Sequence, residues 1–379
     1  MDKMADVLGR AGAWCGQNKY LSAIKNAFQN FMPLTIAGAI GVLWCNVLVN
    51  DQTGLGLFFK PIMALDFLNP AFQAVNFCTI SCITVGITLG IAQEIGVWNM
   101  GAERAGYIPG LVGLAAWLSV TNTSHMVDGA KEAFTGIAGN ELGATGLFTG
   151  MIIGVLSVEL FCFFEKQDAL KIKMPEQVPP GVARAFEVLV PATITLIITA
   201  CIGSACYNLT GLYLNDVIKN GVQGPLGAVG ATVPGVMIIY LVIMLFWLVG
   251  IHGNNMLSAV KEALFTPLAL ENVEAFNKGE TPKNIINMYF LQMCGEFGGS
   301  GVTIGLVIAI IIFGKREDNK AIASLSLVPG LFNINETVTF GIPMVLNPIL
   351  GIPFVFACLV TILVGYVLTV IGFCPVACL

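Results

Sequence analysis

Charged side chains are scarce in this sequence. Only 11% of the 379 residues are Asp, Glu, Lys or Arg, whereas 56% are hydrophobic. An average soluble domain has about 25% charged residues. So few charges cannot cover the surface of a soluble protein of this length, which excludes that class. The formal net charge of −5 is small and spread along the chain, so no nucleic acid is expected as a partner.

Histidine is rarer still, with 2 residues against 11 cysteines. The cysteines lie mostly inside apolar stretches, and pairs such as Cys78 and Cys82 fall on one helix face. Because so few histidines could complete a metal site, we expect small buried thiols and neither a metal nor a cofactor. Residues 1–30 are polar and contain no short apolar run, so no cleavable signal peptide is expected.

Long apolar runs take the place of the missing charges. A helix needs about 20 apolar residues to cross the hydrocarbon layer. Candidate spans lie at 31–50, 74–93, 105–121, 143–164, 187–207, 227–250 and 345–372. Since no β-barrel alternation is present, we predict an all-α polytopic membrane protein with about eight to ten transmembrane helices. The 43 glycines are consistent with helices that pack closely in lipid.

The basic residues predict an orientation in the membrane. With a cytoplasmic N-terminus, the inner loops are 94–104 and 165–186, and they carry Arg104, Lys166, Lys171, Lys173 and Arg184. The outer loops 51–73 and 122–142 carry only Lys60 and Lys131. The segment 261–283 returns inside with Lys261, Lys278 and Lys283. We therefore expect a multi-pass membrane protein with a cytoplasmic N-terminus. The segment 171–184 is either a topology determinant or a docking site for a soluble partner.

The apolar runs after residue 250 are irregular. Gly, Pro and polar residues interrupt them at 250–255, 295–301 and 333–337. Broken helices and re-entrant hairpins occur in membranes only where they line a protein-enclosed cavity, and they indicate a transporter's binding site. We expect a transmembrane scaffold over 1–207, an amphipathic connector over 208–226 and a site-bearing part with re-entrant segments over 227–379. The number of crossings within 284–343 stays open.

Glu336 is the strongest candidate for a functional residue. It is flanked by Asn335 and Thr337 and precedes the last long apolar span. An ionisable group inside a membrane is costly and by default marks a solute pathway; the alternative is a loop at the cytoplasmic boundary. A carboxylate, an imidazole and several amides together offer a polyol hydroxyl its hydrogen-bond partners and a group able to take its proton.

His252 is the candidate imidazole. It follows an almost purely apolar run, and the neighbouring Gly250 and Gly253 permit a break in the backbone. Asn254 adds an amide donor and acceptor. The alternative is a histidine at a membrane boundary that is hydrogen-bonded to a helix end.

Two further segments have alternative interpretations. Trp247 could be an interfacial anchor or a flat surface on which a sugar ring stacks. The segment 298–303, Gly-Gly-Ser-Gly-Val-Thr, lacks the Lys-Ser/Thr of a phosphate loop and precedes an apolar run. Close helix packing or a pore-lining turn is therefore expected there, with Thr303 as a candidate substrate contact.

Several motifs, in order along nearly the whole chain, carry a family resemblance. They are Lys173-Met-Pro-Glu-Gln-Val-Pro-Pro180, Gly250-Ile-His-Gly253, Phe297-Gly-Gly-Ser-Gly-Val-Thr303 and Asn333-Ile-Asn-Glu-Thr-Val-Thr-Phe-Gly-Ile-Pro343. They resemble the lactose/cellobiose/diacetylchitobiose family of phosphotransferase-system (PTS) EIIC components, which has the fold of the EIIC glucose superfamily.

The resemblance implies a sugar permease. Family members are homodimers in which an N-terminal helical domain forms the dimer interface and a C-terminal domain with re-entrant hairpins holds the sugar. Their substrates are β-linked disaccharides and oligosaccharides of the cellobiose, diacetylchitobiose or lactose type. Glu336 and His252 would lie near the 6-hydroxyl that receives phosphate. The other candidate sugar contacts are Trp247, Gly253, Asn254, Asn335, Thr337 and Thr303.

The resemblance also implies protein partners. The phosphoryl donor would be a phosphocysteine on a separate EIIB protein, itself charged from a phosphohistidine on EIIA. The chain would then be the transport component of a protein-Nπ-phosphohistidine–sugar phosphotransferase. A sugar transporter that works without phosphorylation is the alternative function.

Two departures from the family pattern affect this expectation. Thr337 stands where the family usually has Pro, which loosens the fixed φ of the turn and adds a hydroxyl. The sequence ends at Leu379, where family members continue through a Trp-Thr-x-Pro segment and a further apolar helix. The chain could therefore be a fragment, or a truncated paralogue with a structural role. The sequence does not select the sugar.

Overall fold

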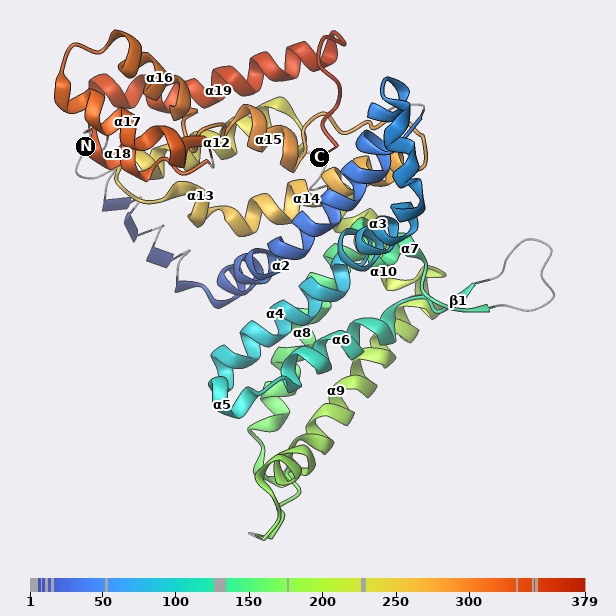
Figure 1. Ribbon diagram of the computed structural model, residues 1–379. Helices are drawn as coiled ribbons and strands as arrows, with labels where there is room; N and C mark the ends of the chain where they lie inside the picture. The colour runs from blue at the N-terminus through green and yellow to red at the C-terminus, as the bar shows by residue number, and fades with distance from the viewer. Residues whose placement is uncertain are drawn as a thin grey trace. The chain divides into compact units, whose positions relative to one another are not determined.

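The computed structural model describes most of the chain (Figure 1). The described residues are 6–7, 9–10, 13–14, 17–51, 54–125, 134–175, 177–225, 230–331, 333–342, 344 and 347–378, without the side chains of Asn140, Ala144, Glu336 and Pro348. The chain forms two compact units. We call Lys19–Pro225 the N-terminal unit, and Leu226–Leu379 together with Met1–Asn18 the C-terminal unit.

The N-terminal unit is built on packed apolar helices. Helix α4 (Ile83–Met100) lies against α2 (Lys19–Leu43), α6 (Ile108–Val120) and α8 (Ala144–Glu165), as Figure 1 shows. Small residues allow this close packing: a Cβ added at Gly113 would collide with Ala92, and one added at Gly150 would collide with Thr88. The long helix α9 (Pro180–Thr210) packs on α6 and α8.

Shorter elements complete the N-terminal unit. A π-helical turn (Trp44–Leu48) extends α2, and 3₁₀ turns at Leu55–Leu57 and Lys60–Leu68 precede α3 (Asn69–Asn76) and a second π-turn (Phe77–Ser81). The remaining elements are α5 (Ala102–Ala105), strands β1 (Ser124–His125) and β2 (Phe134–Thr135), α7 (Gly139–Leu142), the 3₁₀ turn Asp168–Leu170, α10 (Leu214–Ile218) and the π-turn Lys219–Gln223. The strands form an antiparallel hairpin in which Ser124 pairs with Thr135.

The C-terminal unit is built from helices of very different lengths. Its helices are α12 (Val233–Leu248), α13 (Gly253–Met256), α14 (Ser258–Asn277), α15 (Met288–Cys294), α16 (Thr303–Phe313), α17 (Glu317–Leu331), α18 (Glu336–Gly341) and α19 (Pro348–Val370). The core of the unit contains Tyr240, Trp247, Phe265, Leu291 and Ile362. Helix α12 packs on α19, and α16 packs on α17.

The helical prediction for the apolar runs is confirmed. Among the described residues, four helices are long and apolar enough to cross a membrane: Lys19–Leu48, Thr145–Glu165, Pro180–Thr210 and Ile349–Val370. A further candidate is the pair Lys60–Ser81 and Ile83–Met100, which is bent by 42°. Three apolar helices are shorter: Ile108–Val120, Val233–Leu248 and Thr303–Phe313. The predicted span 105–121 is interrupted because Gly106, at a φ of 52°, separates α5 from α6.

One loop prediction is wrong. The segment 261–283 was expected to be a basic inner loop, but Ser258–Asn277 is helix α14. Lys261 is only 6% exposed and pairs with Glu296. A buried, paired lysine is not a free surface charge, so Lys261 does not contribute to an orientation argument based on loop charges.

Candidate functional site

The first part of the candidate site is the break between α12 and α13. Gly250 adopts a φ of 80° after the last turn of α12, a conformation open to glycine and rarely to other residues. His252 then occupies the N-cap of α13, and its Nδ1 accepts a hydrogen bond from the Asn255 amide at 3.2 Å. At Gly253 an added Cβ would collide with the Ile243 carbonyl, so only glycine lets α13 approach α12 this closely. The break lies where the sequence indicates it.

Trp247 lies near the end of α12, just before this break. Its side chain is 0% exposed, which contradicts the interpretation as an interfacial anchor. Its ring centroid lies 4.4 Å from that of His252 and 6.1 Å from that of Phe340. The indole Nε1 is buried and has no hydrogen-bond partner in the described part of the chain. An unpaired buried donor destabilises a protein by about 1–3 kcal/mol, so this N–H lacks the compensation that a hydrogen bond would give it.

The second part of the site is a turn between α15 and α16, which we call the glycine turn (residues 298–302). Four of its residues have positive φ: Gly298 at 79°, Gly299 at 96°, Gly301 at 80° and Val302 at 54°. Glycine adopts such angles freely, but a β-branched residue there is strained by about 1–3 kcal/mol. The strain at Val302 persists only if surrounding contacts hold the turn.

Contacts from α16 and from the segment before α18 hold the start of the turn. The Thr303 hydroxyl donates to the Gly298 carbonyl at 2.6 Å, and the Gly298 amide donates to Asn333 Oδ1 at 2.9 Å. Thr303 is buried, and this hydrogen bond engages its hydroxyl within the protein. Its role in the structure is therefore to brace the turn.

Two predicted site residues converge on Ser300 at the centre of the turn. Asn254 Nδ2 donates to Ser300 Oγ at 2.8 Å, and Asn335 Nδ2 donates to the Ser300 carbonyl at 2.7 Å. Asn254 Oδ1 is buried and has no partner among the described residues. The structure therefore brings Asn254 and Asn335 together through Ser300, a residue that the sequence did not single out.

Glu336 directly follows this arrangement. It is the first residue of α18 (Glu336–Gly341), but its side chain lies outside the described part of the structure. Its distance from His252 thus stays a prediction. Thr337 is exposed on the same short helix, and Phe340, also exposed, contacts Trp247.

A buried ion pair beside the glycine turn was missed in the sequence. Lys261 on α14 pairs with Glu296, and the Tyr240 hydroxyl donates to the same carboxylate oxygen at 2.7 Å. The available signal was a carboxylate two residues before the glycines of the turn. The sequence does not reveal its partner, because the composition of 261–283 fits a loop as well as a helix.

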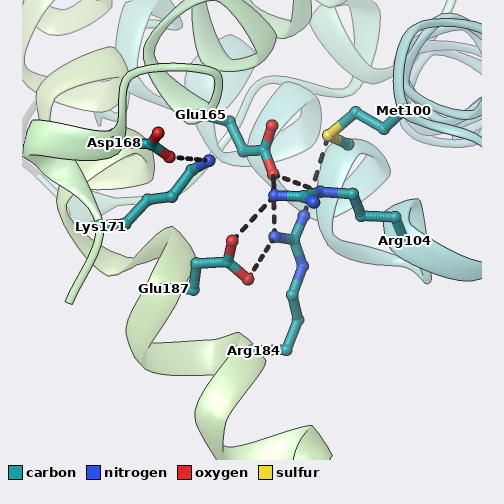
Figure 2. Close-up of polar contacts among 7 residues, drawn as sticks. All are labelled: Met100, Arg104, Glu165, Asp168, Lys171, Arg184 and Glu187. Atoms are coloured by element: carbon teal, nitrogen blue, oxygen red, sulfur yellow. Dashed lines mark hydrogen bonds and ion pairs between the residues drawn. The ribbon is translucent and has the colours of Figure 1, made fainter. Parts of the chain in front are cut away.

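The N-terminal unit has a separate cluster of charges, drawn in Figure 2. Arg104 and Arg184 both bond to Glu165 Oε1, at 2.8 and 2.9 Å, and each also reaches Glu187. The cluster joins α5, the end of α8 and the start of α9. Its two cations and two carboxylates pair with each other, so we interpret it as structural.

Comparisons with known proteins identify the family. The family model described as "Phosphotransferase system, EIIC" matches residues 25–358. The oligo-beta-mannoside-specific EIIC component of the Bacillus subtilis (strain 168) PTS is 32% identical, over 99% of this chain and 83% of that relative. The cellobiose-specific EIIC component of Lactococcus lactis subsp. lactis (strain IL1403) is 29% identical, over 97% of this chain and 86% of that relative.

A solved structure shares the fold. It is that of the transporter ChbC, the IIC component from the N,N'-diacetylchitobiose-specific phosphotransferase system, with a TM-score of 0.86 and 29% identity. The similarity covers 97% of this chain and 84% of that one. The predicted all-α polytopic architecture and the predicted family are thereby confirmed: the chain belongs to the EIIC family and is a membrane permease component of a sugar phosphotransferase system.

Proposed function

We propose that this chain binds and translocates a β-linked disaccharide or oligosaccharide and presents its 6-hydroxyl to a phosphorylated EIIB protein. The sugar class is supported by similar proteins that are named for oligo-beta-mannosides, cellobiose and N,N'-diacetylchitobiose. The observation that carries the site is a pair of buried polar atoms, Trp247 Nε1 and Asn254 Oδ1, with no partner among the described residues. One donates and the other accepts, as a sugar hydroxyl requires.

Different residues of the site hold the sugar and activate its hydroxyl. Glu336 accepts the proton of the 6-hydroxyl, and His252 is its polar partner. As the new bond from the sugar oxygen to phosphorus forms, the bond from the EIIB cysteine sulfur to phosphorus breaks and the sulfur keeps its electrons. The chain itself forms no covalent intermediate. Its contribution is to position the sugar. Asn254 and Asn335, which both hydrogen-bond to Ser300, supply this positioning.

Phosphate-dependent uptake tests the proposal. In vesicles supplied with phosphorylated EIIB, Glu336→Gln should lower uptake of the phosphorylated sugar by roughly 100-fold or more, the usual contribution of a general base. The amide keeps the shape of the side chain but takes up no proton. Unchanged uptake by this variant would contradict the role of Glu336. Uptake of unmodified sugar by the wild type without EIIB would favour the transporter that needs no phosphorylation.

We also infer that the N-terminus is cytoplasmic, that the N-terminal unit is the scaffold and dimerisation domain, and that the C-terminal unit binds the substrate. The orientation is supported by Arg104 and Arg184, which come from the two loops with the basic excess and share the same carboxylates. This contact supports a common side of the membrane for the segments 94–104 and 165–186. A protease-sensitive tag at Met1 should be cut only in inside-out vesicles, and cross-linking in native membranes should yield a dimer.

A further inference from the structure

A buried group of three side chains lies beside the glycine turn. Lys261 on α14 and Glu296, which follows α15, form an ion pair in which the two side chains are 8% and 14% exposed. The Tyr240 hydroxyl on α12 donates to Glu296 Oε1 at 2.7 Å. The Lys261 ammonium lies 5.7 Å from the centroid of the Tyr240 ring. We call these residues the buried triad.

Stability alone is a weak reason for such a group. Removing two charges from water is unfavourable by several kcal/mol for each ion, and well-packed apolar residues often stabilise a core at least as well as a buried pair. A buried pair does fix direction, because each charge destabilises every arrangement in which its partner is displaced. The buried triad therefore suits a role in positioning the segments that carry it.

Each member of the buried triad lies on a segment that also carries part of the candidate site. Tyr240 is two turns before Trp247 on α12, and Glu296 is two residues before the glycine turn. Lys261 is on the first turn of α14, directly after the segment with Asn254. The triad thus joins the segments that carry Trp247, Asn254 and Ser300, whereas Asn335 reaches Ser300 from the separate segment before α18.

We propose that Lys261, Glu296 and Tyr240 are positioning residues of the sugar site. They hold the strained glycine turn so that Ser300 orients the amides of Asn254 and Asn335 toward the solute. The inference rests on the proposed function, because it assumes that the two asparagines contact the sugar. It adds residues that touch neither the sugar nor the phosphoryl group.

The sugar affinity of the purified protein tests this role. With cellobiose and diacetylchitobiose as probes in calorimetric titrations, Glu296→Gln and Lys261→Met should each weaken binding by roughly tenfold or more, as expected when a buried pair is broken. Tyr240→Phe removes one hydrogen bond and keeps the ion pair, so it should fold normally and weaken binding by roughly threefold to tenfold. Lys261→Arg keeps the charge and should retain most of the affinity.

A double-mutant cycle separates positioning from general damage. If Glu296 acts through Asn335, the double variant Glu296→Gln/Asn335→Ala should bind no more weakly than Asn335→Ala alone. Two controls come from α14 and its C-cap. Asn272→Ala removes a buried amide that bonds to Asn284 and Ala377, and Lys278→Gln breaks an exposed pair with Glu274. The first should lower the melting temperature without weakening sugar binding, and the second should change neither.

Three results would overturn the inference while leaving the proposed function intact. The first is an unchanged sugar affinity in Glu296→Gln. The second is a double variant in which the losses of affinity from Glu296→Gln and Asn335→Ala multiply. The third is a loss of affinity in Asn272→Ala that equals the loss in Glu296→Gln at a matched fall in melting temperature. A wild-type protein that binds neither sugar nor any other β-linked disaccharide would instead overturn the proposed function, and with it the positioning role.

Discussion

Gly299 is the residue of the glycine turn whose Cα faces the side chain of Asn335. Its φ is 96°, and an added Cβ would lie 2.5 Å from the Asn335 Cβ. Gly299→Ala should therefore strain the backbone by about 1–3 kcal/mol and push Asn335 away from Ser300. We expect at least a tenfold loss of sugar affinity in titrations, the equivalent of about 1.4 kcal/mol.

Gly305 provides the matched control for that substitution. It lies within α16, and an added Cβ would meet nothing within 4 Å. Gly305→Ala should leave sugar affinity unchanged and stabilise the helix by up to about 1 kcal/mol. Equal losses of affinity in the two alanine variants would show that the glycine turn has no special part in binding.

Trp247 gives a second prediction at the residue scale. Trp247→Phe removes the buried Nε1–H, which has no partner among the described residues. If that N–H meets a sugar hydroxyl, affinity should fall by about tenfold, equivalent to roughly 1.4 kcal/mol. The melting temperature should change little, because relief of the unpaired donor offsets the lost packing.

Trp117 is the control for this change. It is also fully buried with an Nε1 that has no partner among the described residues, but it lies on α6 in the N-terminal unit. Trp117→Phe should leave sugar binding as it is in the wild type. Unchanged affinity in Trp247→Phe would remove the indole from the list of sugar contacts.

At the scale of elements, the sequence predicts long helices well and short ones poorly. Apolar runs such as 143–164 and 187–207 correspond to α8 and α9 because burial in lipid requires a continuous apolar segment. The helices α13, α15 and α18 have 4, 7 and 6 residues. Such short helices show no periodic pattern and depend on tertiary contacts that are far apart in sequence.

The candidate site shows the same division. His252 and Gly253 could be recognised because glycines, an imidazole and amides interrupt an apolar run. Ser300 could not, since its importance comes from Asn254 and Asn335, which are 46 and 35 residues away. The burial of Lys261 is not evident from the sequence, because a charged stretch has the same composition whether it forms a loop or a helix with one buried face.

Asn287 allows a test of how a short helix is stabilised. Its Oδ1 accepts from the amides of Tyr289 and Phe290 at the start of α15, and its Nδ2 donates to the Asn284 and Ala377 carbonyls. Asn287→Ala removes the cap and leaves buried groups unpaired. We expect a loss of about 2–4 kcal/mol in the free energy of unfolding, measured by thermal denaturation.

The comparison for Asn287 is Asn347, which caps α19 in the same way. Its Oδ1 accepts from the amides of Ile349 and Leu350. Asn347 is partly exposed, so water can replace its hydrogen bonds, and Asn347→Ala should destabilise by only about 1 kcal/mol. A loss as large as that of Asn287→Ala would mean that burial of the cap is not the decisive factor.

At the scale of the whole molecule, the division into two compact units predicts two thermal transitions. Sugar at 100 times its Kd stabilises the unit that binds it by about 2.7 kcal/mol. Calorimetry with and without cellobiose should therefore move one transition and leave the other in place. Glu165→Gln, which breaks the cluster in Figure 2, should lower the other transition and identify it as that of the N-terminal unit.

A result in which sugar raises both transitions equally would contradict this assignment. So would a single transition that Glu165→Gln and sugar both shift, because the two units would then unfold together. In either case sugar binding in the C-terminal unit alone would not account for the stabilisation.

The pairing of Lys261 with Glu296 also sets an order of events at the ribosome. The two residues are 35 positions apart, and synthesis proceeds at about 5–20 residues per second, so the lysine is made roughly two to seven seconds before its partner. During that interval Lys261 lacks the carboxylate that it pairs with in the folded protein, and the adjacent Glu262 is the nearest carboxylate along α14. We expect α14 to pack in its final position only after the segment with Glu296 has been made, so that the two segments fold together.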